Sequence, residues 1–264
     1  MTTNPYEPPQ TAADIVVAQV VEEPRKKPWG FWATGGLSLL IGGAFVGAQT
    51  VVAIVAVVAG MATHPPSTGT DLTEVIDVGS GWLMAAATWA SFPVCLGLIA
   101  IAVKLRRGWS IREYLALESV SPGKAAMWLV LVPVFAAATD TFTWLLGRPI
   151  VSDVMLHAYR TAYWLPLLWA AFLIAAPVFE ETFMRGFMFR GLQASRLGNA
   201  GAILITSLIF ALLHLQYDWY GMLMCGLIGL LLGTARAATG STLVPIAMHS
   251  LSNLIATVEA HLLS

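Results

Sequence analysis

Charged residues are scarce in this chain. Its 264 residues include 14 Lys and Arg and 15 Asp and Glu, so 11% of the residues are charged while 57% are apolar. Soluble domains carry about 25% charged residues, so this composition excludes an ordinary soluble globular protein. The net charge of -1 provides no basic surface of the kind that contacts nucleic-acid phosphates. The sequence therefore predicts a lipid bilayer as a partner and no nucleic acid.

Cysteine is also scarce. Cys95 and Cys225 are the two cysteines of the chain, and both lie in apolar segments. Two such residues cannot form a disulfide framework, and they lack the spacing of metal ligands. We expect two buried, unreactive thiols.

Long apolar segments recur along the chain. They cover residues 30–62, 82–103, 125–147, 162–183, 200–216, 219–235 and 242–262, and about 20 apolar residues suffice to cross a hydrocarbon core. Backbone polar groups find no water in lipid, so such segments form helices or a closed barrel, and continuous apolar runs favour helices. We predict an all-α, polytopic membrane helix bundle of about seven to eight transmembrane helices.

The chain divides into three predicted parts. Residues 1–24, rich in Pro, Thr and Glu, are typical of a disordered N-terminal tail. They do not form a signal peptide, because the apolar run after the basic residues 25–27 is too long for one. Residues 25–124 are predicted to hold the N-terminal transmembrane helices and an interfacial cytoplasmic helix at 104–124. Residues 125–264 form the membrane core that carries the motifs described below. In the interfacial helix, the side chains expected to face lipid are Trp109, Ile111, Tyr114 and Leu115.

Basic residues mark the predicted cytoplasmic side. Lys and Arg gather at residues 25–27 and 104–124, and Arg190 and Arg196 follow the fourth apolar segment. The loop at 63–81 has no Lys or Arg, and it contains Asp71, Glu74 and Asp77. Cytoplasmic loops carry an excess of Lys and Arg. We expect an integral, multi-pass protein of a bacterial cell membrane with a cytoplasmic N-terminus.

Charged residues that lie inside or directly beside these apolar segments include Asp140, Glu180, Glu181 and Arg185. A charge near the bilayer centre costs at least about 2.5 kcal/mol, so each of them needs a partner or a function. Glu181 and Arg185 are four residues apart and can pair on one helix face. Glu180 is rotated by about 100° from Glu181 and has no local counter-charge. Asp140 is predicted to be either a structural hydrogen-bonding group or part of a cavity wall.

Two later apolar segments contribute polar side chains. His214 ends the sequence Phe210-x-x-x-His214, and His249 and Asn253 are four residues apart. A lone His in an apolar helix is more often a core residue, but three helices that each carry such groups indicate a shared interior site. These groups suit the attack of water on a carbonyl. Glu180 would be the general base and His214 would hold the water or pass on its proton.

The remaining motif residues have supporting parts in this scheme. His249 and Asn253 can donate to an oxyanion, and Glu181 and Arg185 can hold Glu180 in place. Alternatively, Glu180, His214 and His249 bind zinc and leave one position open for water, although the His-Glu-x-x-His zinc signature is absent. Spacing alone does not decide between these two sites.

The three motifs resemble those of the CPBP family of intramembrane proteases. This family includes the CAAX prenyl proteases and the bacteriocin-processing, Abi-like self-immunity proteins, and the resemblance covers roughly residues 125–262. It implies that Glu180 and His214 activate water and that His249 and Asn253 stabilise the oxyanion. It implies a glutamate-dependent peptidase without a cofactor, with zinc as the less favoured alternative.

Two other functions remain open from the sequence. In a proton-coupled transporter, Asp140, Glu180, Glu181 and His214 would form a proton relay, but the chain lacks the paired repeats of many transporters. A noncatalytic membrane scaffold or immunity protein of the same fold has little physical reason to keep buried charges. We therefore predict an intramembrane endopeptidase that cleaves a membrane-associated or lipidated protein or peptide, with a cavity that opens toward the cytoplasm.

Overall fold

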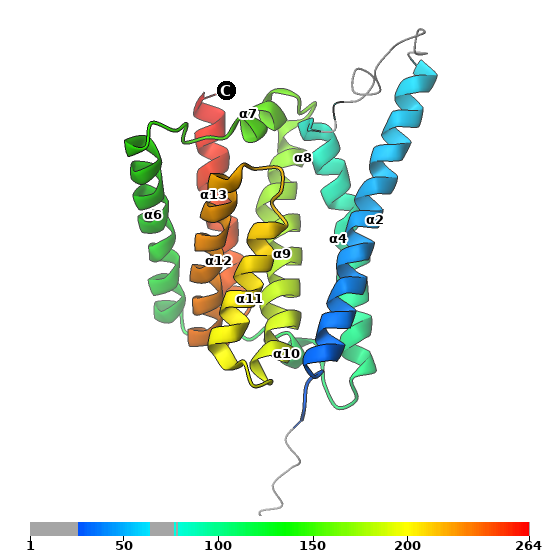
Figure 1. Ribbon diagram of the computed structural model, residues 1–264, viewed down its shortest axis with the longest axis vertical. Helices are drawn as coiled ribbons and strands as arrows, with labels where there is room; N and C mark the ends of the chain where they lie inside the picture. Colours follow the sequence, from blue (N-terminus) through cyan, green and yellow to red (C-terminus); the bar gives the residue numbers. More distant parts are fainter. Residues whose placement is uncertain (1–25, 64–76, 78, 264) are drawn as a thin grey trace, which may run out of the picture.

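The computed structural model describes residues 26–63, 77 and 79–263. The tail predicted at residues 1–24 lies outside the described residues, as do Asp71 and Glu74. Within the described part of the chain, the regular secondary structure is helical (Figure 1). This confirms the predicted helical membrane bundle.

Among the described residues, six helices are long and apolar enough to cross a membrane. Four of them are α2 (Phe31–Thr63), α4 (Gly81–Leu105), α6 (Pro122–Leu145) and α12 (Trp219–Thr239); the fifth is α13 (Leu243–Leu263), and the sixth spans residues 165–193. A seventh, α11 (Gly198–Leu212), is apolar but has only 15 residues. α2 packs on α4, α11 on α12 and α6 on α13, and the helix at 165–193 is the most buried of the six.

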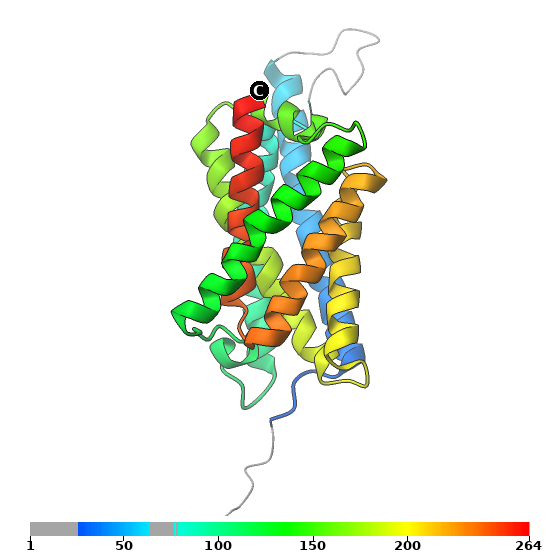
Figure 2. The same cartoon turned by 90° about the vertical axis from the view of Figure 1, so that its left-hand side faces the viewer.

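Successive long helices run in opposite directions, so their connections alternate between the two ends of the bundle (Figures 1 and 2). We call the end where α2 begins and α4 stops the basic end. We call the opposite end the α7 end, because the short helix α7 (Asp153–Arg160) and the turn between α11 and α12 lie there. The basic end carries Lys26, Lys27, Lys104, Arg106, Arg107, Arg112, Lys124, Arg190 and Arg196.

The prediction of an interfacial helix at residues 104–124 is wrong. Only α5 (Ile111–Tyr114) is helical between Leu105 and Pro122, and its side chains fold inward rather than toward lipid. Tyr114 and Leu115 are buried, the Tyr114 hydroxyl accepts from the Trp29 amide at 3.3 Å, and its ring stacks on Phe187. Burial raises the pKa of Tyr114 to about 12. Trp109 and Ile111 pack partly buried against the same core.

The helix at residues 165–193 consists of five consecutive pieces. These are α8 (Leu165–Ala170), the π-helix η1 (Ala171–Ala175), α9 (Ala176–Glu181), the π-helix η2 (Thr182–Met188) and α10 (Phe189–Gln193). Pro177, which has no N–H to donate, is the second residue of α9, directly after the wide turn of η1. The sequence placed the end of this span at residue 183, but the helix continues for ten more residues, and Glu180 lies near its middle.

The half of the bundle next to the basic end is closely packed. Its core is formed by α2, α4, α5, α9 and η2, and it excludes water from large side chains such as Phe187 and Tyr114. A Cβ atom on Gly191 of α10 would lie 1.9 Å from the Thr34 hydroxyl oxygen, so α10 and α2 approach closely here. Both cysteines are free thiols, but Cys95 is buried in this core whereas Cys225 is only partly buried.

Candidate active site

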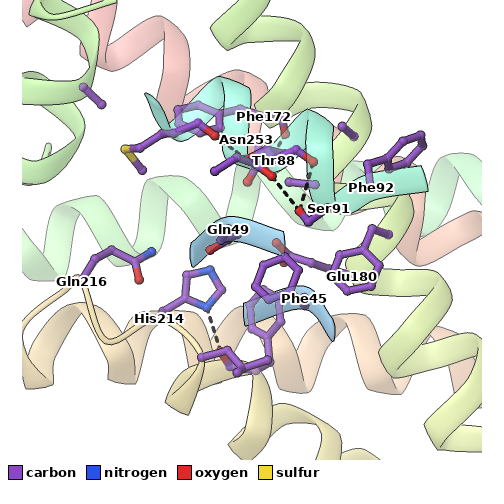
Figure 3. Close-up of a pocket in the computed structure, with 18 of the residues that line it drawn as sticks. Phe45, Gln49, Thr88, Ser91, Phe92, Phe172, Glu180, His214, Gln216 and Asn253 are labelled. Carbon is purple, nitrogen blue, oxygen red and sulfur yellow. Dashed lines mark hydrogen bonds between the residues drawn. The ribbon is translucent and has the colours of Figure 1, made fainter. Parts of the chain in front are cut away.

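A cavity of about 550 Å³ separates the α2–α4 pair from the C-terminal helices (Figure 3). All four residues predicted to act in catalysis line it: Glu180, His214, His249 and Asn253. They come from α9, the turn after α11, and α13. The structure therefore brings the three sequence motifs to one place.

A buried ion pair lies behind the part of the cavity wall that carries Glu180. The Arg185 guanidinium donates to Glu181 Oε1 at 2.9 Å and to the Gly229 carbonyl of α12 at 2.9 Å. Both charged side chains are fully buried, and the guanidinium also lies 5.1 Å from the centre of the Phe210 ring. The predicted pairing of Glu181 with Arg185 is confirmed. Their network joins η2 to α12, and hence fixes the helix that carries Glu180.

His249 connects this network to the cavity. Its Nδ1 lies 2.9 Å from Glu181 Oε1. An ionised carboxylate only accepts hydrogen bonds, so Nδ1 carries the proton and donates it. The other ring nitrogen, Nε2, lies 4.0 Å from Glu180 Oε2. Glu181 thus fixes the orientation of a ring whose second nitrogen faces the Glu180 carboxylate.

Glu180 presents an unpaired carboxylate oxygen. Its side chain is 24% exposed, yet Oε2 is buried and has no hydrogen-bond partner among the described residues. Leaving such an acceptor unsatisfied costs about 1–3 kcal/mol. Oε2 itself has almost no surface open to water, so a water molecule or a substrate group in the cavity contacts the exposed part of the Glu180 side chain.

His214 does not lie inside a transmembrane helix, contrary to the predicted segment at 200–216. α11 ends at Leu212, and His214 follows in the turn at the α7 end. Its Nδ1 lies 2.7 Å from the Phe210 carbonyl oxygen, and because a carbonyl only accepts, Nδ1 is the donor. The ring stacks on Tyr217. This bond and the stacking hold His214 against the cavity with Nε2 left for another partner (Figure 3).

Asn253 has a backbone partner within the bundle. Its side-chain Nδ2 donates to the Phe172 carbonyl of η1 at 2.8 Å. An amide carries two N–H groups, so one remains for a substrate, and its predicted part in holding the oxyanion stays a prediction. The bond also joins α13 to the π-helix that precedes Glu180.

Gln49 is a cavity residue that the sequence analysis missed. It lies on α2, one helical turn beyond Phe45, whose ring stacks on Phe179 beside Glu180. Among the described residues its amide has no hydrogen-bond partner, whereas the nearby hydroxyls of Thr88 and Ser91 donate to backbone carbonyls of α4. Gln49 is neutral, so it is not among the intramembrane charges, but it is an amide within the apolar segment at 30–62 and is recognisable as such from the sequence.

Asp140 lies apart from this cavity. It lies near Glu259 of α13, close enough for the two carboxyl groups to interact electrostatically, and neither residue lines the cavity described here. Of the two predicted roles, that of a wall of this cavity is therefore not supported, and that of a structural hydrogen-bonding group stays a prediction.

No three His, Cys, Asp or Glu side chains in the described part of the chain stand close enough together to hold a metal ion. Glu180, His214 and His249, the alternative zinc ligands, share the cavity but are not arranged as a ready metal site. The Nδ1–H of His249 nevertheless donates to a carboxylate, which is how proteins orient histidines that bind zinc. The residue types thus suit zinc better than their present spacing does.

One comparison with known proteins finds a similar family. Residues 162–255 match the family model described as "Type II CAAX prenyl endopeptidase Rce1-like", and this segment contains Glu180, Glu181, Arg185, His214, His249 and Asn253. No curated protein and no solved structure matches the chain. The segment is thus similar to the Rce1-like CAAX endopeptidases, which confirms the resemblance to the CPBP intramembrane proteases.

Proposed function

We propose that this protein is an intramembrane endopeptidase that uses Glu180 to activate water. The observation that carries the proposal is the Glu180 side chain, which lines a cavity together with His214 and His249 and whose carboxylate accepts no hydrogen bond from the described residues. A carboxylate with a free acceptor oxygen can hold a water molecule and take its proton. The family match supports a membrane peptidase.

The proposed reaction passes through a tetrahedral intermediate. Glu180 accepts a proton from water while the water oxygen attacks the carbonyl carbon of the peptide bond, and His214 Nε2 orients that water. The resulting oxyanion accepts hydrogen bonds from the free Asn253 N–H and from His249 Nε2 in its protonated form. Collapse of the intermediate breaks the C–N bond, and the proton held by Glu180 passes to the leaving amine.

The cavity walls favour an apolar, membrane-held substrate. Most of the lining side chains are apolar, including Phe45, Phe92, Phe172 and Leu83, and such walls accept alkyl chains or apolar residues. The matched family is described as prenyl endopeptidases. We propose a membrane-associated or lipidated protein or peptide as substrate, and a bacterial cell membrane as the location.

Two variants test the catalytic assignment. Glu180→Gln keeps the shape of the side chain but cannot take a proton, and His214→Ala removes the second group. Loss of a general base lowers turnover by about 10²- to 10⁴-fold, measured with a farnesylated CAAX peptide and by comparing protein termini in membranes from wild-type and variant cells. Near-normal turnover in purified, folded Glu180→Gln protein would refute the proposal.

A chelator separates the two forms of water activation. If Glu180 acts without a metal, the purified enzyme keeps its full activity after treatment with a zinc chelator. Loss of activity that added Zn²⁺ restores would instead assign Glu180, His214 and His249 as zinc ligands. The Glu180→Gln protein serves as the background, because it should be inactive with or without the chelator.

A further inference from the structure

The two ends of the bundle differ sharply in positive charge. The basic end carries the nine Lys and Arg residues named above, whereas within the described residues the α7 end has Arg148 and Arg160. Arg148 is paired with Asp218 at that end. Loops that stay in the cytoplasm are the ones enriched in Lys and Arg. The charge distribution therefore assigns the basic end to the cytoplasm.

The cavity belongs to the opposite end. Its lining includes Val154, Met155 and Ala158 of α7, together with Gln216 and Tyr217 in the turn between α11 and α12. Along α2 the lining runs from Gly42 to Ala53, and along α4 from Leu83 to Phe92, so it extends from mid-helix toward the α7 end. None of the lining residues comes from the connections of the basic end at 106–121, 194–197 or 240–242.

Packing closes the route from the basic end. Arg185 and Phe187 lie between Glu180 and the basic end, and both are fully buried. Tyr114, which is also fully buried, packs beside them with its ring stacked on Phe187. Arg236 donates to the Arg185 carbonyl at 2.9 Å and ties α12 to this layer. Water therefore reaches Glu180 through the α7 end or from the side, and not through the core.

These facts make two expectations from the sequence incompatible. A cytoplasmic N-terminus and a cavity open to the cytoplasm cannot both hold, because the N-terminal residues described here and the cavity lie toward opposite ends (Figure 1). The charge asymmetry decides which one to keep. We propose that the active site opens to the extracytoplasmic side, and that the substrate is a membrane-anchored polypeptide whose cleavage site lies in the outer half of the bilayer.

This inference rests on the proposed peptidase function for the nature of the substrate, but not for the direction of access. Its consequence is that a lipidated C-terminus confined to the cytoplasm does not reach Glu180. The enzyme would act instead on an anchored segment of a protein or peptide after that segment has crossed the membrane.

Thiol labelling in intact cells tests the direction of access. In a background with Cys95→Ala and Cys225→Ala, single cysteines replace Leu215 at the α7 end and Leu197 at the basic end, both exposed leucines in turns. A membrane-impermeant maleimide should label Leu215→Cys in intact cells and Leu197→Cys only after permeabilisation. Labelling of Leu197→Cys in intact cells would overturn the proposal.

A second pair of variants tests whether the cavity itself is open to that side. Thr88 lines the cavity about 10 Å from the start of α4, and Val258 lies on the exposed surface of α13 about 8 Å from its end. A charged methanethiosulfonate added to intact cells should modify Thr88→Cys at least about tenfold faster than Val258→Cys, because lipid contains no water to carry the reagent.

Modification of Thr88→Cys only from the cytoplasmic side, or from neither side, would overturn the proposal. These readouts do not require catalysis, so they should be the same in the presence of Glu180→Gln. Active Glu180→Gln protein with the expected labelling would refute the peptidase mechanism alone. Inactive Glu180→Gln protein with the opposite labelling would refute the direction of access alone.

Discussion

The two halves of this bundle use similar apolar helices in different ways. In the half near the basic end, a charged pair, Glu181 and Arg185, is buried and bonded within a packed core. In the half near the α7 end, Glu180 and Gln49 line a cavity, and neither side chain has a hydrogen-bond partner among the described residues. The packed half holds Glu180 and His249 in place, and the hollow half leaves polar side chains open to a ligand. Precise sites need such rigid support behind them.

The largest effect on stability is expected from breaking the packed half at Arg185. Arg185→Met leaves the Glu181 charge buried without its cation, and removing one partner of a buried pair costs about 3–5 kcal/mol of unfolding free energy. Thermal unfolding in detergent measures the loss. The double variant Glu181→Gln, Arg185→Met should recover part of it, because no charge is then left uncompensated. A single variant as stable as wild type would contradict the rigid-support view.

An intermediate effect is expected at the contact between α4 and α7. A Cβ atom on Gly81 would lie 1.9 Å from the Ala158 carbonyl oxygen of α7, so Gly81→Ala forces α4 and α7 apart. Overpacking of this kind costs about 1–3 kcal/mol. The matched control is Gly97→Ala on the same helix, where no neighbouring atom lies within 4 Å. Equal unfolding temperatures for the two variants would show that α7 does not pack as tightly as described.

The smallest effect is expected from a polar group in the hollow half. If the Gln49 amide binds the substrate backbone, Gln49→Leu should raise KM by about 2- to 12-fold, the worth of one net hydrogen bond, with little change in kcat or in stability. Thr50→Val is the control, because the Thr50 hydroxyl already donates to the Val46 carbonyl at 2.8 Å. A lower kcat with unchanged KM would instead place Gln49 among the groups that act on the transition state.

The bundle and the motif residues are predictable from the sequence because a charge inside lipid has a high free-energy cost. Charged residues are therefore rare in apolar segments, and those that occur there stand out. The pairing of Glu181 with Arg185 followed from helical spacing alone, and the structure confirms it. The segment at 104–124 was misread because Trp109 and Tyr114 are equally suited to a membrane surface and to a core, and only tertiary contacts decide between them. His214 was placed too far inside a helix because the apolar pattern continues past Leu212, where the helix itself ends.

The π-helix η1 has a consequence for how the two neighbouring glutamates divide their work. A π turn takes up about one residue more than an α turn, and one residue corresponds to about 100° of rotation about the helix axis. η1 therefore sets the rotational phase of α9, in which Glu180 faces the cavity and Glu181 faces the buried arginine. If a deletion within Ala171–Ala175 turned this stretch into a regular α-helix, Glu180 would rotate away from the cavity although every motif residue was still present. Insertion and deletion are thus as damaging to this site as substitution.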